Sequence, residues 1–319
     1  MAEPLFSIVI PVYNRAASLR CALRSVLDQT LQDFEIVVVD DGSHDDPKSV
    51  VDAFGDPRIR FVRQDNRGGG AARNTGIDSA RGRLIAFLDS DDVFLPAHLQ
   101  TMQRLLAATI DTVGYAPMIV DRGAGRTFIK PPRAIGASEH MAHYLMCDRG
   151  FVPTITLVLP REIARRIRYN DSLPFAQDTD FAIRLFLAGC TFVMAEQPGA
   201  IWKDVLDPNR ASAGRKGARL LSWIEELRPL IPVQAYYGCR GWMIAKGIVT
   251  TNPFEALRLY VQALSRGCYS ARLATIVFLQ IFFPDTLYRS LADVAISLFR
   301  GAVWSRGEKR NLAPRIANP

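Results

Sequence analysis

The stretch "LIAFLDSDDVFLP", residues 84–96, joins an apolar segment to a cluster of acids. Its first five residues are all apolar, which predicts a strand that is buried on both faces. Asp89, Asp91 and Asp92 follow within four positions, and like charges this close repel each other by about 1 kcal/mol per pair even in water. A hard divalent cation such as Mg²⁺ or Mn²⁺ binds carboxylate oxygens and would offset this repulsion. The alternative interpretation is an acidic turn that caps the following helix.

Strand and helix patterns alternate in the chain before this stretch. The patterns predict strands at 6–14, 34–43 and 59–64, and helices at 15–30, 46–55 and 68–81. This alternation predicts an α/β fold with a Rossmann-like, mostly parallel sheet and helices on both faces. Ligands bind such sheets beyond the carboxyl ends of the strands. We therefore expect Asp40, Asp41 and Asp89, which follow buried strands, to lie on a binding rim.

Composition places the chain among ordinary globular proteins. Of its 319 residues, 49% are hydrophobic and 22% are charged, which excludes a disordered or fibrous chain. Five scattered cysteines contain no C-x-x-C pair, so neither a disulfide scaffold nor a thiolate zinc site is expected. The first residues lack the pattern of a secretory signal, and the apolar run 273–283 is shorter than the ~20 residues that span a bilayer. These features predict a cytoplasmic protein.

Charge divides the chain into two unlike parts. Residues 1–208 hold 23 Lys and Arg against 26 Asp and Glu, whereas residues 209–319 hold 16 against 6. We therefore predict an α/β catalytic domain over 1–208 and a basic, mainly helical extension over 209–319. Such an extension suits an anionic membrane surface or a homo-oligomer interface, although a solvated basic face is the plainer interpretation. No nucleic-acid partner is expected, because no recognised motif accompanies the charge.

Two further segments combine helix starts with polar side chains. In "NRGGGAARNTG" (66–76), glycines lead into a helix N-terminus, which suits phosphate oxygens, although the Lys-Ser/Thr ending of a P-loop is missing. In "QDTDFAIRLFLAG" (177–189), Asp178 and Asp180 lie in the first turn of a predicted helix. Acids there stabilise a helix by ~0.3–1 kcal/mol through its dipole. Alternatively, one of them is a general base, a role that supplies ~10²–10⁴-fold of rate.

Taken together, these segments resemble family 2 of the inverting nucleotide-sugar glycosyltransferases, which have the GT-A fold. The resemblance is carried by "SIVIPVYNRAASLRCALRSVLDQTLQDFEIVVVDDGS", "NRGGGAARNTGI", "GRLIAFLDSDDVFLP" and "AQDTDFAIRLFLAG". These pieces cover roughly residues 5 to 190 in the order and spacing of the family.

The resemblance implies a role for each matching position. It implies a base pocket lined by Pro11, Val12 and Tyr13, base contacts from Asp41 and Asp40, and a ribose or phosphate contact from Arg73. Asp89 and Ser90 begin the Asp-x-Asp motif of the donor site, and Asp91 with Asp92 would bind Mn²⁺ or Mg²⁺. Asp178 matches the catalytic base of the family.

The implied reaction is a single displacement that inverts the anomeric carbon. Asp178 would deprotonate an acceptor hydroxyl, and the metal ion would offset the charge that grows on the leaving diphosphate. The donor is expected to be a nucleoside-diphosphate sugar, most simply UDP-linked, and the acceptor a saccharide or a lipid-linked sugar. The resemblance further implies bacterial polysaccharide or glycolipid synthesis by a peripheral protein on the inner face of the plasma membrane.

The sequence departs from the family pattern in two places. Gln177 precedes Asp178, where the family usually has Glu, and this leaves the choice of base between Asp178 and Asp180 open. After the base helix the family often has an aromatic-Arg pair, whereas this chain has "WKDVLDPNRAS" (202–212). Lys203 or Arg210 is therefore expected to contact the diphosphate.

Two alternative functions remain at this point. "LDSDDV" also fits the motif of haloacid-dehalogenase-type phosphatases, in which Asp89 would be the nucleophile. That motif normally follows the first strand of its fold, however, and here three strand–helix units precede it. The other alternative is a non-catalytic sugar-nucleotide-binding scaffold, which the loss of Glu at position 177 makes conceivable.

Overall fold

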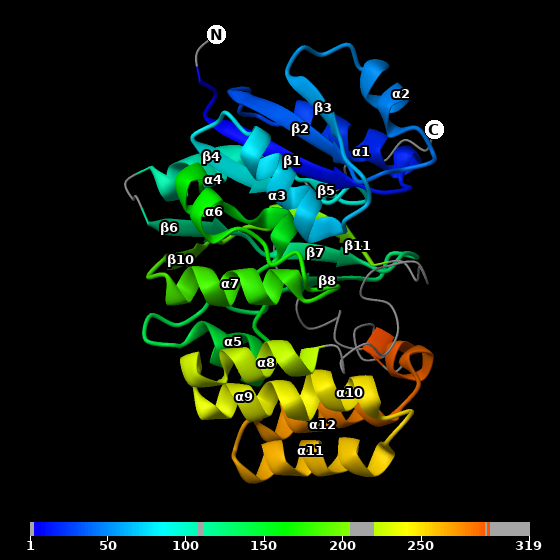
Figure 1. The fold of residues 1–319 in the computed structure, drawn as a ribbon, viewed down its shortest axis with the longest axis vertical. Coiled ribbons are helices and arrows are strands. Elements are labelled where there is room, and N and C mark those ends of the chain that lie inside the picture. The colour runs from blue at the N-terminus through cyan, green and yellow to red at the C-terminus, as the bar shows by residue number, and fades with distance from the viewer. Residues whose placement is uncertain (1–2, 108–110, 205–219, 291, 294–319) are drawn as a thin grey trace.

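The computed structural model describes residues 3–107, 111–204, 220–290 and 292–293. The α/β part of the chain contains two sheets, and a group of helices from the C-terminal part packs at one end of it (Figure 1). This arrangement confirms the predicted α/β fold with additional C-terminal helices.

The main sheet has seven strands in the order β10-β6-β9-β4-β1-β2-β3. All neighbours in it are parallel except β9, which is antiparallel to both β4 and β6. Every residue of β2 is buried, as its apolar run predicts. The strands are β1 (Phe6–Val12), β2 (Phe34–Asp40), β3 (Ile59–Arg63), β4 (Leu84–Phe87), β6 (Thr112–Tyr115), β9 (Val158–Pro160) and β10 (Thr191–Met194).

Helices cover both faces of this sheet because successive side chains of each strand point to opposite sides. Ile8 and Ile10 of β1 belong to a hydrophobic cluster with helices on one face, and Val9 belongs to a cluster with helices on the other. The helices on the first face are α1 (Ala16–Leu27), α2 (Pro47–Asp52) and α4 (His98–Leu106). Those on the second face are α3 (Gly69–Ser79), α5 (Met141–Cys147), α6 (Arg161–Ile167) and α7 (Gln177–Leu187).

A glycine allows α3 to pack closely against β1. A Cβ atom at Gly76 would lie 2.2 Å from Cγ1 of Val9, which is fully buried. Gly76→Ala is therefore expected to lower the free energy of unfolding by ~1–3 kcal/mol, the usual cost of overpacking a core. Urea denaturation measures this. Gly136→Ala is the control, because its added Cβ would make only ordinary contacts at 3.5 Å. Equal stability of the two variants would contradict the prediction.

A second sheet lies at the carboxyl ends of the main strands. Its order is β5-β11-β7-β8, with β11 parallel to β7 and the other neighbours antiparallel. The strands are β5 (Val93–Phe94), β7 (Met118–Asp121), β8 (Thr127–Lys130) and β11 (Ala200–Lys203). Because β5 follows the acidic cluster directly, this sheet forms one wall beside the predicted binding rim.

The C-terminal helices share a core with the α/β part. They are α8 (Leu221–Leu227), α9 (Val233–Cys239), α10 (Ala245–Ile248), α11 (Pro253–Ser265) and α12 (Ala271–Phe282), with a π-helix at Arg240–Ile244. Buried residues of these helices belong to the same hydrophobic cluster as those of α5 and α7. The indole Nε1 of Trp223 also donates a hydrogen bond to Asp180 of α7 at 2.8 Å. The predicted domain boundary at 208/209 lies outside the described residues.

The apolar run 273–283 packs partly into the protein core, whereas a lipid-contacting segment would expose its apolar side chains. It forms most of α12, and its Leu273, Val277 and Ile281 are buried in the shared core. Within the described part of the chain, no helix combines the length and hydropathy needed to cross a bilayer.

Candidate active site

One cavity of about 690 Å³ opens where the main sheet and the second sheet meet. Ten of the residues to which the sequence assigned a binding, metal or base role line it: Pro11, Val12, Tyr13, Asp41, Arg73, Asp89, Ser90, Asp91, Asp92 and Asp178. They come from the ends of β1, β2 and β4 and from the helices α3 and α7. Parallel strands therefore bring segments together that are more than 160 positions apart in the sequence.

The two aspartates after β2 have different surroundings. Asp41 lines the cavity, and its carboxylate accepts hydrogen bonds from Gln64 Nε2 at 2.7 Å and from the backbone N–H groups of Arg67 and Gly68 at 2.9 and 2.8 Å. It thereby fixes the glycine-rich loop at the start of α3. Asp40 is fully buried and does not line the cavity.

The carboxylate of Asp40 is used within the fold. It accepts hydrogen bonds from the backbone N–H of Ser43 and from Arg63 Nη1, both at 2.9 Å. The expectation that Asp40 contacts a nucleotide base does not fit this position, because adjacent residues of an extended segment point to opposite sides. Asp41 alone of the pair faces the cavity.

Two arginines offset the acidic cluster after β4. Arg73 Nη2 lies 2.6 Å from Oδ1 of Asp89, and Arg15 forms an ion pair with Asp91. Asp92 is almost fully buried and accepts a hydrogen bond from the backbone N–H of Lys203 at 2.9 Å. The last contact ties the acidic loop to β11. The charge repulsion predicted from the sequence is thus relieved by two cations, which lie 16 and 76 positions from their partners in the chain.

These surroundings limit the kind of metal site that the cavity provides. Among the described residues, no group of three or more His, Cys, Asp or Glu is placed to hold a metal ion. Mg²⁺ typically needs only one or two carboxylates when substrate phosphates and water complete its ligands. Asp89 and Asp91 are both partly exposed at the cavity. The residues therefore fit an ion bound together with a diphosphate, but not a site built by the protein alone.

Asp178 and Asp180 are distinguished by their contacts. Asp180 is 2% exposed, and its Oδ2 accepts from Arg184 Nε at 2.8 Å while its Oδ1 accepts from Trp223. Asp178 lines the cavity and accepts a hydrogen bond from the backbone N–H of Thr179 at 2.8 Å. Asp180 thus holds α7 against α8, and only Asp178 faces the space where a substrate would bind.

The local environment changes the acidity of Asp178. Burial raises the pKa of its carboxyl, while the Thr179 N–H and the positive charges of Arg73 and Lys130 oppose this increase. A carboxylate with a raised pKa is a stronger base than an ordinary aspartate. This shift is in the direction that proton abstraction from a hydroxyl requires.

Gln177 links Arg73 to the loop before α7. Its Oε1 accepts from Arg73 Nη1 at 3.1 Å and its Nε2 donates to the carbonyl of Leu173 at 2.7 Å. Gly70 permits this approach, because a Cβ there would lie 3.0 Å from Gln177 Nε2. An amide therefore occupies the position of the usual Glu and still orients Arg73.

Some residues that line the cavity were not predicted by any sequence motif, and neither of the two residues expected to contact the diphosphate is among the described residues that line it. Lys203 contributes its backbone to the Asp92 contact but does not line the cavity, and Arg210 lies outside the described residues. Residues that line the cavity and that we did not expect there include Arg15, Met118, Phe151, Asp171, Phe175 and Trp202. Arg15 lies two positions after Tyr13, one of the expected base-pocket residues, and this is the one local signal for its position.

Comparisons with known proteins agree with this geometry. A model of the family described as "Glycosyl transferase family 2" matches residues 7–184. The amylovoran biosynthesis glycosyltransferase AmsB of Erwinia amylovora is 30% identical over 254 residues, which are 76% of this chain and 84% of the relative. The putative glycosyltransferase EpsH of Bacillus subtilis is 38% identical over 127 residues, 39% of this chain and 37% of its own length.

Solved structures share the fold. The S. aureus TarS structure in complex with UDP-GlcNAc has a TM-score of 0.59 and 16% identity, and the match covers 94% of this chain and 93% of that one. The mannosyltransferase PcManGT of Pyrobaculum calidifontis, in complex with GDP-Man and Mn²⁺, has a TM-score of 0.56 and 17% identity over 96% and 89% of the two chains. These likenesses show a GT-A fold. With the family match and the AmsB relationship, they establish that this chain is a glycosyltransferase and belongs to glycosyltransferase family 2.

Proposed function

We propose that the chain transfers a sugar from a nucleoside-diphosphate donor to an acceptor hydroxyl with inversion, and that Asp178 is the general base. The observation that carries this proposal is that Asp178 faces the same cavity as Asp41, Asp89 and Asp91. The donor's base would bind near Tyr13 and Asp41, and its diphosphate near Arg73. The buried Nε of Arg73 has no hydrogen-bond partner among the described residues, so this guanidinium retains donor capacity for a phosphate.

A divalent cation fits the proposal at the acidic loop. Asp91, with Asp89 beside it, would hold Mn²⁺ or Mg²⁺ jointly with the diphosphate, and the ion would neutralise negative charge on the leaving group. We prefer Asp91 to Asp92 as the ligand because Asp92 is almost fully buried and bonded to the backbone of β11. Arg15 and Arg73 would also neutralise part of the negative charge on the leaving diphosphate.

The donor and the pathway are inferred from the relatives. TarS was solved with UDP-GlcNAc and PcManGT with GDP-Man, so a uridine or a guanosine diphosphate sugar suits the fold. The names of AmsB and EpsH favour synthesis of a bacterial exopolysaccharide, with a saccharide or lipid-linked acceptor.

A thermal-shift screen of UDP-, GDP- and dTDP-sugars tests the donor proposal. A ligand that binds only the folded state raises stability, by about 2.7 kcal/mol at a hundred times its Kd. We expect one nucleotide series to raise the melting temperature and Asp41→Ala to abolish that increase. If every nucleotide sugar leaves the melting temperature unchanged with and without Mn²⁺, the proposed donor site is wrong.

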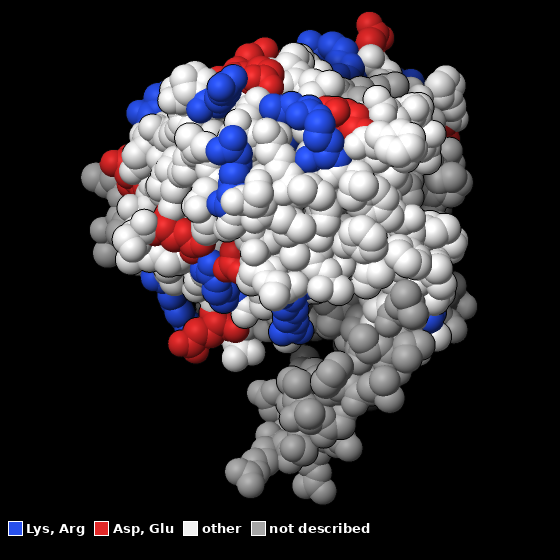
Figure 2. Space-filling view, turned by 90° about the horizontal axis from the view of Figure 1, so that it is seen from below, with Lys and Arg blue, Asp and Glu red and all other residues white. Residues whose placement is uncertain are grey.

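We further propose that α11 contacts an anionic membrane surface at the inner face of the plasma membrane. Apolar side chains spaced three or four residues apart form an exposed stripe on this helix: Phe254, Leu257, Val261 and Leu264. Phe254 is 86% exposed. Figure 2 looks onto this end of the molecule and shows a broad uncharged area beside several Lys and Arg side chains.

The charges near the stripe support a lipid partner. Residues 253–283 contain three arginines but only one acid, Glu255, and Glu255 is already paired with Arg258 at 2.6 Å. Basic residues near anionic lipid contribute ~1 kcal/mol each, and each inserted large apolar side chain adds ~1.5–3 kcal/mol. The stripe together with Arg266 and Arg272, the two arginines that are not paired with Glu255, would support reversible attachment.

Vesicle sedimentation tests the membrane contact. We expect binding to phosphatidylcholine vesicles that contain anionic phosphatidylglycerol, and at least ~10-fold weaker binding of the double variant Phe254→Ser, Val261→Ser. Ile129→Ser is the control, since Ile129 is 49% exposed on β8. Equal binding by all three proteins would refute the contact. A wild-type dimer that the double variant converts to a monomer would instead identify α11 as a homo-oligomer interface.

A further inference from the structure

Lys130 is a partly buried cation beside the cavity. It is the last residue of β8 and pairs with Met118 of β7. Its Nζ lies 4.1 Å from the ring centroid of Phe151 and 5.8 Å from that of Trp202. Met118, Phe151 and Trp202 all line the cavity. Two aromatic rings therefore hold this ammonium group at the edge of the substrate space.

Lys130 lies close enough to Asp178 for the two charges to influence each other. Its positive charge is one of the influences that lower the pKa of the Asp178 carboxyl against the effect of burial. Lys130 belongs to an edge strand of the second sheet, whereas Tyr13 and Asp41 follow strands of the main sheet. In the proposed reaction the Asp178 end receives the acceptor, because the base must reach the attacking hydroxyl.

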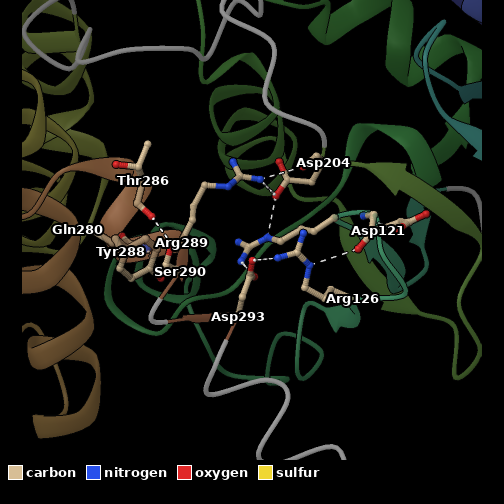
Figure 3. Close-up of polar contacts among 11 residues, drawn as sticks. Asp121, Arg126, Asp204, Gln280, Thr286, Tyr288, Arg289, Ser290 and Asp293 are labelled. Carbon is tan, nitrogen blue, oxygen red and sulfur yellow. Dashed lines mark hydrogen bonds and ion pairs between the residues drawn. The ribbon is translucent and has the colours of Figure 1, made fainter.

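Several of the charges near Lys130 are matched with one another. The carboxylate of Asp204 accepts from Arg122 Nε at 3.1 Å and from Arg289 Nη2 at 2.7 Å. Asp293 in turn binds Arg122 and Arg126 at 2.8 and 3.0 Å. Figure 3 shows Arg289 directed at Asp204 and Arg126 at Asp293. In the described ranges, Lys130 forms no ion pair with any of these carboxylates.

Among the described residues Lys130 therefore has anions nearby, Asp178 and Asp204, but no direct ion pair with either. Burial lowers the pKa of its ammonium group, and the nearby charge of Arg149 adds to this effect, whereas Asp178 and Asp204 oppose it. A partly desolvated cation gains most from a bound anion, because electrostatic attraction is stronger where water is excluded. A lysine also has a flexible four-carbon stem, which lets the ammonium group reach an anion that enters between the two rings.

We propose that Lys130 binds an anionic group of the acceptor, a phosphate or a carboxylate, next to the hydroxyl that Asp178 activates. This inference deepens the proposed function and rests on it only for the assignment of the Asp178 end to the acceptor. The cavity would then select an acidic acceptor, such as a sugar phosphate, a lipid-linked phosphate or a uronic acid, over a neutral sugar.

The geometry favours the acceptor over the donor's diphosphate as the source of this anion. Two other cations, Arg15 and Arg73, already stand at the acidic loop where the diphosphate is expected. Lys130 contacts neither Asp89 nor Asp91, and its aromatic neighbours Phe151 and Trp202 come from segments beyond that loop. A separate anion subsite is the simpler assignment.

Ligand-observed NMR on the full chain, saturated with UDP and the diamagnetic ion Mg²⁺, tests the subsite without requiring turnover. The probes are methyl phosphate, methyl glucuronide and the neutral methyl glucoside. We expect one of the two anions to bind and the glucoside not to bind. Lys130→Met should weaken the bound anion at least about tenfold, in line with a lost hydrogen bond to a charged group, and Lys130→Arg should retain most of the affinity. Methyl phosphate binding would indicate a phosphate-bearing acceptor, and glucuronide binding a uronic acid.

Two controls separate this role from a structural one. Lys48→Met removes an exposed lysine that is paired with Asp52 and should leave anion affinity unchanged. Lys130→Met should keep the wild-type UDP affinity, and its melting temperature should change little, because it loses the two ring contacts but no ion pair within the described residues. If Lys130→Met weakens UDP binding instead, or if neither anion binds the wild type, the subsite is refuted. Intact UDP binding in that second case would leave the proposed donor site standing.

Discussion

Asp178→Asn is expected to slow glycosyl transfer by about 10²–10⁴-fold, the usual contribution of a general base. Asparagine keeps the size of the side chain and can still accept the Thr179 N–H hydrogen bond, but it cannot take a proton from an acceptor hydroxyl. The affinity for the nucleotide should change little, because the donor contacts come from other residues. Steady-state kinetics and nucleotide calorimetry on the same protein separate the two effects.

The pH dependence of the wild-type enzyme is a second, independent test of Asp178 as the general base. Burial raises the pKa of Asp178. As the pH is lowered, kcat/KM should therefore begin to fall at a higher pH than it would if the base were an aspartate with an ordinary pKa. The carboxylate is the active form, so activity is present above the folded-state pKa and is lost as the pH decreases through it. An acidic limb at the ordinary Asp value would argue against Asp178 as the base.

Asp180→Asn is the matched control for Asp178→Asn. It alters the neighbouring carboxylate on the same helix turn, but Asp180 is bonded to Arg184 and Trp223 and does not line the cavity. We expect it to lower the stability by about 1–3 kcal/mol, since one buried charged contact is lost, with a much smaller change in kcat. If Asp180→Asn abolished transfer while Asp178→Asn did not, the assignment of the base would be reversed.

Local pattern accounts for the parts of the fold that the sequence predicts well. The apolar runs at 6–12, 34–40 and 84–88 are each followed by polar turn residues, so both the strands and the rim at their ends can be inferred without tertiary information. The helix that begins at Gln177 is similarly marked by its acidic first turn and apolar face.

Contacts between distant segments explain what the sequence left open. Arg15 and Asp91 are 76 positions apart, and nothing near either residue signals their ion pair. The choice between Asp178 and Asp180 depends on Trp223, which comes from the C-terminal helices. Lys130 lies on a short strand without a motif and gains its setting only where β7, β8 and β11 meet. The apolar run 273–283 similarly does not indicate on its own whether it faces lipid or the core.

Removal of divalent cations is expected to weaken nucleotide binding at least tenfold. We expect calorimetry to show tighter binding of UDP or GDP with Mn²⁺ than with EDTA, because an ion held by Asp91 and the diphosphate neutralises charge in addition to Arg15 and Arg73. Binding is the appropriate measurement, since it reports on the ion without depending on turnover. A wild-type protein that binds both nucleotides equally with Mn²⁺ and with EDTA would show that the arginines suffice.

Asp91→Asn locates the ion within this site. Since Arg15 is paired with Asp91, the substitution removes one partner of this guanidinium and a carboxylate ligand at once. We therefore expect metal-free nucleotide binding to be maintained or improved, while the gain from Mn²⁺ disappears. Asp171→Asn is the matched control, because Asp171 is an exposed acid that lines the same cavity away from the acidic loop. A Mn²⁺ response that survives Asp91→Asn but is lost in Asp171→Asn would place the ion elsewhere in the cavity.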